Sequence, residues 1–154
     1  MPLRKLNRLI ALNALKNFDI TKNLPLNTLF ELNEKKNKIN INDLGYLIGP
    51  ILNAGGRLGK SQYATELLSS NNDQVIKDRS TYLIKLNNKR KEIETLVLNE
   101  IDFQKIEKEN KEVIIYYNPN INEGLIGIIA ARLKDYFNKP VSYTHLTLPT
   151  IYSV

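Results

Sequence analysis

Apolar positions recur along the first third of the chain with the spacing of short helices. Three leucines at three-residue steps predict an amphipathic helix over residues 7–17, namely Leu9, Leu12 and Leu15. Leu24-Pro25-Leu26 predicts a break, after which Asn27 or Thr28 would cap a short helix ending at Leu32. This part of the chain is therefore expected to be helical.

The next segment contains a polar stretch and a Gly-Pro pair, both of which predict interruptions of helical structure. Residues 33–40 are polar and lysine-rich, which is typical of a solvated loop. Asn42 or Asp43 is expected to cap a short helical segment over residues 44–48, and Gly49-Pro50 is expected to interrupt it.

One long helix is predicted for the middle of the chain. Residues 61–70 have a helical pattern, and residues 71–73 are expected to form a turn and a cap. From Gln74 to about Asn110 there is no Gly or Pro, and apolar residues recur at helical steps. Such a helix would be on the order of 50 Å long at 1.5 Å per residue. Its narrow apolar stripe is typical of a helix that bridges two bodies or forms a coiled-coil seam.

The last part of the chain has the pattern of a βαβ unit. Residues 112–117 (EVIIYY) predict a buried strand, residues 118–120 a turn, and residues 124–137 a helix. Residues 139–141 then lead into another strand, so a parallel layer is expected after residue 111. The predicted fold class is α/β, with a mostly helical N-terminal part and a long connecting helix.

Composition narrows the chemistry that the chain can perform. The 154 residues carry 22 Lys and Arg against 16 acids, a net charge of +6, which favours polyanions. The absence of cysteine excludes disulfides and thiolate sites and fits the cytoplasm. The single histidine, His145, excludes a histidine-rich metal cluster. No apolar run is long enough to span a bilayer, so no membrane association is expected.

The window ILNAGGRLGK, residues 51–60, is the most unusual in the chain. It ends like a phosphate loop, but Ala54 stands where that pattern needs its first glycine, which argues against a nucleotide-triphosphate site. Residues 53–57 (NAGGR) are interpreted as a tight glycine turn that delivers Arg57. The guanidinium could bind phosphate, or it could pair with a nearby acid in a purely structural turn, and both interpretations stand.

Two further segments have a functional and a structural interpretation. Residues 122–127 (NEGLIG) begin a helix after a strand, where free backbone N–H groups favour an anion, although the glycines also suit close packing. Residues 85–91 (KLNNKRK) could contact nucleic acid, although a charge run on a helix is usually a solvated face.

Several segments in the same order resemble the RecJ family of DHH-type phosphoesterases. They are Pro2-Leu3 with Asn7-Arg8, the stretch Gly49 to Leu58 with its Asn-Ala-x-Gly-Arg motif, Ala64 to Leu68, Asn87 to Glu94, Asn122 to Leu133, and Phe137 to Val141. The resemblance divides the chain into the end of a DHH catalytic domain (1–72), a connecting helix (73–110), the start of a DHHA1-like domain (111–141) and a tail (142–154).

The resemblance implies a function for an intact protein. Family members are 5′-to-3′ single-strand-specific DNA exonucleases of recombination and repair, which use Mn²⁺ or Mg²⁺. Single-stranded DNA is the implied partner, together with a single-strand-binding protein. The implied substrate-binding residues are Asn53, Gly55, Gly56, Arg57, Asn122 and Gly124.

The sequence also departs from the family's pattern. No Asp-His-His occurs, so Met1 is interpreted as an internal start and this chain alone is expected to bind no metal and to be inactive. Asn122 stands where many relatives have His, and residues 142–154 lack the expected Gly-x-Gly-Arg-Ser segment and are interpreted as a non-native tail. The alternatives are a non-catalytic single-strand-binding or scaffold module and a fragment of another DHH phosphoesterase.

Overall fold

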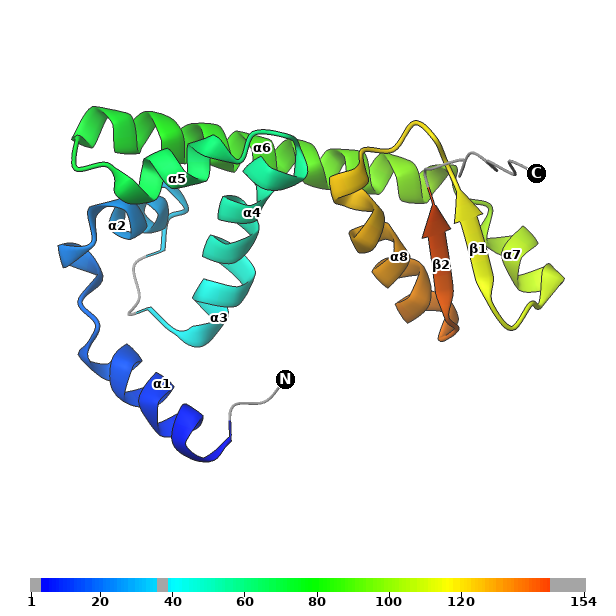
Figure 1. The fold of residues 1–154 in the computed structure, drawn as a ribbon, viewed down its shortest axis with the longest axis horizontal. Coiled ribbons are helices and arrows are strands. Elements are labelled where there is room, and N and C mark those ends of the chain that lie inside the picture. The colour runs from blue at the N-terminus through cyan, green and yellow to red at the C-terminus, as the bar shows by residue number, and fades with distance from the viewer. Residues whose placement is uncertain (1–3, 36–38, 145–154) are drawn as a thin grey trace, which may run out of the picture. The chain divides into compact units, whose positions relative to one another are not determined.

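The computed structural model describes residues 4–35 and 39–144, and the chain forms two compact units (Figure 1). Unit 1 comprises Met1–Gly56 and Lys60–Asn87, and unit 2 comprises Arg57–Gly59 and Asn88–Val154. The predicted fold class is confirmed, because a mostly helical part is joined to a small parallel sheet. The four-part domain division made from the sequence stays a prediction. Within the described ranges, no helix is both long and apolar enough to cross a membrane.

Unit 1 is built from helices. They are α1 (Lys5–Asn17), the 3₁₀ turn η1 (Ile20–Lys22), α2 (Leu24–Leu32), α3 (Ile41–Asp43), the π-helical segment η2 (Leu44–Ile48), α4 (Gly49–Arg57), α5 (Gln62–Ser69) and the first half of α6 (Asp73–Glu100). The core of this unit consists of side chains that α2, α4, α5 and α6 bury completely, namely Leu29, Ile51, Leu67, Ile76 and Leu83. Helix α1, by contrast, contributes no buried residue.

The start of α2 differs from the sequence-based expectation. The helix begins at Leu24, and Asn23 caps it by accepting a hydrogen bond from the Leu26 N–H at 3.1 Å. Pro25 therefore lies in the first turn, where its missing N–H costs nothing because the N–H groups there have no partner within the helix. The proline belongs to the helix start and does not break the helix.

Gly49-Pro50 does not interrupt the next helix either. Asn40, and not Asn42 or Asp43, is the N-cap, and it forms a capping box with Asp43. The backbone then continues through η2 into α4, since Leu44 and Gly49 both have right-handed helical angles. A wider π turn directly before Pro50 accommodates the proline ring, which in a regular α-helix would clash with the preceding turn.

Helix α6 is shorter than the sequence predicts. It ends at Glu100 instead of about Asn110, so its 28 residues span about 42 Å. The chain then bends at the buried residue Ile101, and Asp102 caps a separate helix, α7 (Phe103–Glu109), by accepting from the Lys105 N–H. The bend has no Gly or Pro to announce it, which is why periodicity alone extends the helix too far.

Unit 2 contains the predicted parallel layer. Strand β1 (Ile114–Tyr117) pairs with β2 (Val141–Thr144), from Ile114 opposite Val141 to Tyr117 opposite Thr144, and α8 (Glu123–Phe137) connects them. The core lies between the end of α6 and α8 and includes Val97, Ile101, Ile121, Leu125, Ile129 and Leu133.

Two expectations for this sheet need correction. Strand β1 is buried only at Ile114, while Ile115 is 74% exposed, so it is not the fully buried strand that its composition suggests. Residues 142–144 belong to β2, although the sequence-based division places them in the tail. The rest of that segment, residues 145–154, lies outside the described residues together with His145.

Candidate functional site

The motif at residues 53–57 lies in the last two turns of α4, which ends at Arg57. The interpretation as a glycine turn is wrong, because Gly55 and Gly56 continue the helix and neither has a positive φ. The left-handed residue is Gly59, with φ of 71°, two positions beyond the motif. The motif is therefore a helical surface followed by a turn.

The two adjacent glycines occupy different environments. A Cβ at Gly55 would lie 2.7 Å from the Lys60 carbonyl oxygen and 3.2 Å from a methyl carbon of Leu83, so packing within unit 1 requires a glycine there. A Cβ at Gly56 would meet no heavy atom within 4 Å. Glycine in a helix costs about 0.5–1 kcal/mol relative to alanine. No contact among the described residues accounts for that cost at Gly56.

Asn53, Gly56 and Arg57 share one face of α4. Residues three and four apart are neighbours on a helix surface, so Gly56 and Arg57 both lie beside Asn53. Asn53 and Gly56 are exposed and Arg57 is half-buried, while Ile51, Ala54 and Gly55 are buried. We call Asn53, Gly56 and Arg57 the α4 face.

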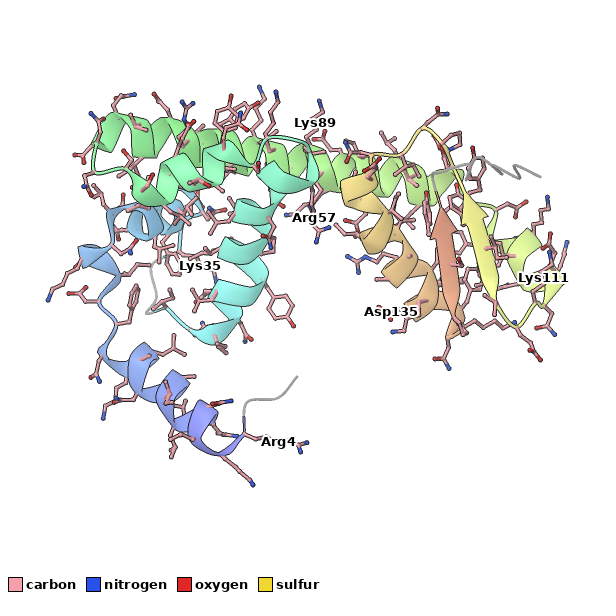
Figure 2. The ribbon with its side chains drawn as sticks, viewed as in Figure 1. Arg4, Lys35, Arg57, Lys89, Lys111 and Asp135 are labelled. Carbon is pink, nitrogen blue, oxygen red and sulfur yellow. The ribbon has the colours of Figure 1, made fainter. Side chains whose placement is uncertain are left out.

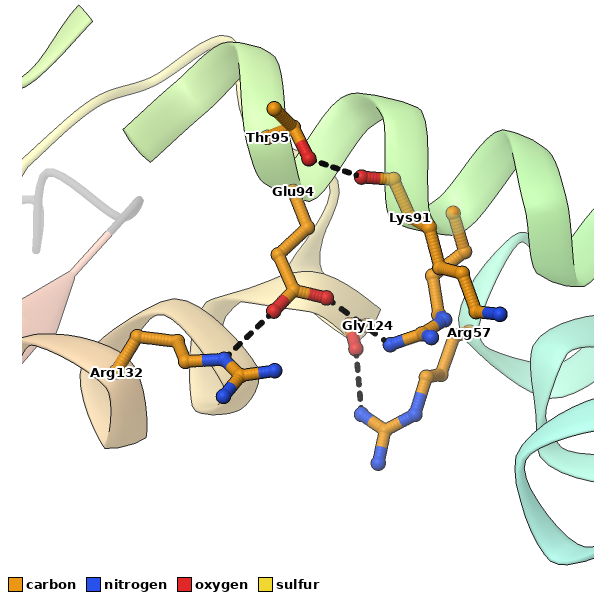
Figure 3. A network of polar contacts seen from close by, with 7 residues as sticks. Arg57, Lys91, Glu94, Thr95, Gly124 and Arg132 are labelled. Carbon is orange, nitrogen blue, oxygen red and sulfur yellow. Dashed lines mark hydrogen bonds and ion pairs between the residues drawn. The ribbon is translucent and has the colours of Figure 1, made fainter. Parts of the chain in front are cut away.

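Arg57 is anchored by one hydrogen bond. Figure 2 labels Arg57 among the side chains of the chain. The Nη1 of Arg57 donates to the Gly124 carbonyl oxygen at 2.8 Å, within unit 2 (Figure 3). An acidic partner, which the structural interpretation required, is not found for Arg57 among the described residues. A guanidinium carries five N–H donors, so most of the donors of Arg57 remain available after this bond. The carbonyl thus fixes the side chain without neutralising its charge.

The start of α8 is explained by capping and packing. Asn122 is the N-cap, and its side-chain oxygen accepts from the Gly124 N–H at 2.9 Å. A Cβ at Gly124 would collide with the backbone of Arg57, so a glycine is needed for the close approach of these two segments of unit 2. The geometry supports the packing interpretation of this glycine. Substrate contact by Asn122 or Gly124 stays a prediction.

A buried carboxylate joins α6 to α8 beside this contact (Figure 3). Glu94 is 7% exposed and accepts from Arg90 at 3.1 Å and from Arg132 Nε at 2.9 Å. The hydrogen bond and charge of Glu94 raise the pKa of Arg132 above its ordinary value. Reasoning from the sequence missed this network. Only the four-residue spacing of Arg90 and Glu94 announces it, because Arg132 is 38 residues away.

The lysine-rich run on α6 is mostly a solvated face. Lys85, Lys89 and Lys91 are exposed, whereas Arg90 is half-buried and forms an ion pair with Glu94. Within the residues that the structure describes, no group of three or more His, Cys, Asp or Glu side chains could hold a metal ion.

Comparisons with known proteins agree on one family. No protein-family model matches the chain. The single-stranded-DNA-specific exonuclease RecJ of Haemophilus influenzae is 33% identical over 148 residues, which is 92% of this chain and 26% of the relative. The RecJ of Bacillus subtilis is 28% identical, over 91% of this chain and 18% of the relative. The chain therefore spans about a quarter of the length of the first relative and less of the second.

Solved structures show the same fold. Crystal structures of RecJ from Thermus thermophilus in complex with Mn²⁺ and with Mg²⁺ match with TM-scores of 0.78 and 0.77 at 23% identity. They cover 93% and 94% of this chain, and 22% and 23% of theirs. The resemblance drawn from the sequence is thereby confirmed.

Proposed function

We propose that this chain, a RecJ-type segment by its sequence and fold, is the part of a single-strand-specific DNA exonuclease that holds the strand at the α4 face. The intact enzyme would hydrolyse phosphodiester bonds from the 5′ end, with Mn²⁺ or Mg²⁺ activating water and stabilising charge on the phosphate. The proposal includes single-stranded DNA as substrate, a single-strand-binding protein as partner and a cytoplasmic location. The named relatives are exonucleases specific for single-stranded DNA.

The observation that carries this proposal is the open space at Gly56 next to an anchored arginine. A helix that has no structural need for a glycine loses stability by keeping one, so a close-approaching ligand is a sufficient reason for it. Arg57 has its guanidinium fixed by the Gly124 carbonyl and presents unused donors from the same face. A fork of N–H donors matches the oxygens of a backbone phosphate. Asn53 adds an exposed amide one turn away.

The experiment measures binding of the full chain to a labelled single-stranded oligonucleotide by fluorescence anisotropy at several salt concentrations. We expect salt-sensitive binding, because phosphate contacts release counterions. Arg57→Ala should weaken binding on the order of tenfold and lower the salt dependence. Gly56→Ala should weaken binding as well, although it should leave the fold as stable as before or more stable.

Two matched controls separate this role from general effects. Arg8→Ala removes the same charge from the exposed surface of α1, and Gly127→Ala fills open space in α8. Both should bind like the unchanged chain. Equal affinity of the Gly56→Ala and Arg57→Ala variants and these controls would contradict the α4 face as the binding surface.

The same chain should not cut DNA. A 5′-labelled single strand incubated with the chain and Mn²⁺ is expected to stay intact, because the described residues include no group that could hold the ion. Metal-dependent digestion that disappears in the Arg57→Ala variant would overturn this expectation.

A further inference from the structure

Tyr46 is the most exposed of the large apolar and aromatic side chains that the structure describes. Its exposed fraction is 84%, and it lies in η2, directly before α4. Within the described residues it takes part in no ring pair and no side-chain hydrogen bond, unlike Tyr63, Tyr82 and Tyr116. A single exposed aromatic is ordinary on a protein surface. The functional argument for Tyr46 rests on its position relative to the α4 face.

Tyr46 lies on the same side of the helix as the α4 face. The backbone is helical without interruption from residue 41 to residue 57. Asn53 and Arg57 are seven and eleven residues beyond Tyr46, which correspond to about two and three helical turns. The opposite side of the same helix is buried through Ile48, Ile51 and Ala54. A partly exposed strip therefore runs from Tyr46 to Arg57, in which Gly49, Pro50 and Arg57 are half-buried. Its length is roughly 17 Å at about 1.5 Å per residue.

We propose that Tyr46 is a stacking position for a nucleobase of the same single strand whose phosphate Arg57 holds. Proteins that bind single strands combine cationic groups along the backbone with aromatic rings on which bases stack. The strip from Tyr46 to Arg57 has one element of each kind, separated by the length of a few nucleotides. This inference rests on the proposed function, because it takes the α4 face as the path of the strand. The proposed function assigns a phosphate contact to Arg57, and this inference adds a base contact at Tyr46.

The chain offers a direct spectroscopic test because it contains no tryptophan. Tyr46→Trp introduces a single reporter, and stacking of a base should quench its fluorescence when a single-stranded oligonucleotide is added. Tyr136→Trp is the matched control, since Tyr136 is 61% exposed and lies on α8, which is not part of the strip. We expect strong quenching for the first variant and little for the second. An abasic strand of the same length should bind but should not quench.

Affinity provides the second measurement. Tyr46→Ala should weaken binding on the order of tenfold, and Tyr46→Phe, which keeps the ring and loses only the hydroxyl, should bind like the unchanged chain. At 84% exposure the alanine variant should fold normally, which far-ultraviolet circular dichroism verifies. Quenching lost with the abasic strand, together with this affinity pattern, supports the inference.

The failures of the two proposals are distinguishable. Binding that is sensitive to Arg57→Ala, but that neither quenches the Tyr46→Trp reporter nor changes in Tyr46→Ala, overturns the stacking role and leaves the α4 face intact. Absence of any single-strand binding by the full chain contradicts both proposals.

Discussion

Three helical glycines of the chain have different surroundings. Gly55 makes room for the Lys60 carbonyl, Gly124 makes room for the backbone of Arg57, and Gly56 has open space around it. These surroundings imply two different responses to an added methyl group. At Gly55 and Gly124 the methyl group would meet backbone atoms, which move only with their segments. At Gly56 it would meet nothing that belongs to the described part of the chain.

Gly124→Ala is therefore expected to destabilise the chain by about 1–3 kcal/mol. Alanine is the better helix former by about 0.5–1 kcal/mol, but the clash with the Arg57 backbone should outweigh this gain. Gly127→Ala is the matched control on the same helix, and it should stabilise by up to about 1 kcal/mol because its Cβ meets no atom within 4 Å. Urea unfolding measures the change in the free energy of unfolding for both variants, which should have opposite signs. Equal changes for the two glycines would contradict the close approach at Gly124.

The residues of the motif could be found from the sequence, but their geometry could not. Two adjacent glycines before an arginine suggest a turn because glycine tolerates positive φ, yet in this chain they continue a helix and Gly59 takes the left-handed position. The helix is stabilised here by burial of Ile51 and Ala54, which lies outside any local pattern. Tyr46 had no local signal either, because its exposure depends on the tertiary fold. Glu94 had only its four-residue spacing from Arg90, because its second partner, Arg132, is 38 residues away.

At the scale of elements, the positions of helices can be predicted from the sequence, but some of their boundaries cannot. The helices α1, α5 and α8 are located correctly from the sequence, because apolar residues at helical spacing indicate a helix. The spacing does not show what the apolar side contacts, since α1 buries no residue. The sequence predicts breaks at Pro25 and Pro50, where a helix start and a π turn in fact accommodate the prolines. The end of α6 was missed, because it depends on the burial of Ile101 and on the Asp102 cap.

The contact of α6 with α8 depends on Glu94. Glu94→Gln keeps the shape of the side chain but removes the charge that two arginines share. Removing one partner of a fully buried pair costs about 3–5 kcal/mol, and Arg132 is 64% exposed, so we expect a smaller loss of about 1–3 kcal/mol. Glu92→Gln changes the same charge at an exposed position of α6 and should stay within about 0.5 kcal/mol of the unchanged chain.

Urea unfolding followed by circular dichroism measures the effect of both substitutions. High salt provides a second comparison, since the largely buried Arg90–Glu94 pair is screened much less than exposed charges. The loss in Glu94→Gln should therefore persist at high salt. A loss no greater than that of Glu92→Gln would show that the carboxylate does not hold the two helices together.

At the scale of the whole molecule, one face of the parallel sheet is only partly covered. Alternate side chains of a strand point to the same face. On one face, the side chain directly before β1 and two side chains of β1 are all exposed: Val113 46%, Ile115 74% and Tyr117 49%. The other face packs into the core through Ile114 and Tyr116. Parallel sheets are ordinarily covered on both faces, so an open one favours contact with another apolar surface.

The full chain should therefore self-associate as its concentration rises, and sedimentation velocity measures this directly. Ile115→Thr keeps a β-branched residue and the net charge while it removes apolar surface from the middle of the open face. It should shift association to higher concentration. Leu96→Thr is the matched control, because Leu96 is an exposed side chain of α6, 63% accessible, and belongs to no strand. If Ile115→Thr associates like Leu96→Thr and the unchanged chain, the open sheet face is not the surface through which the chain self-associates.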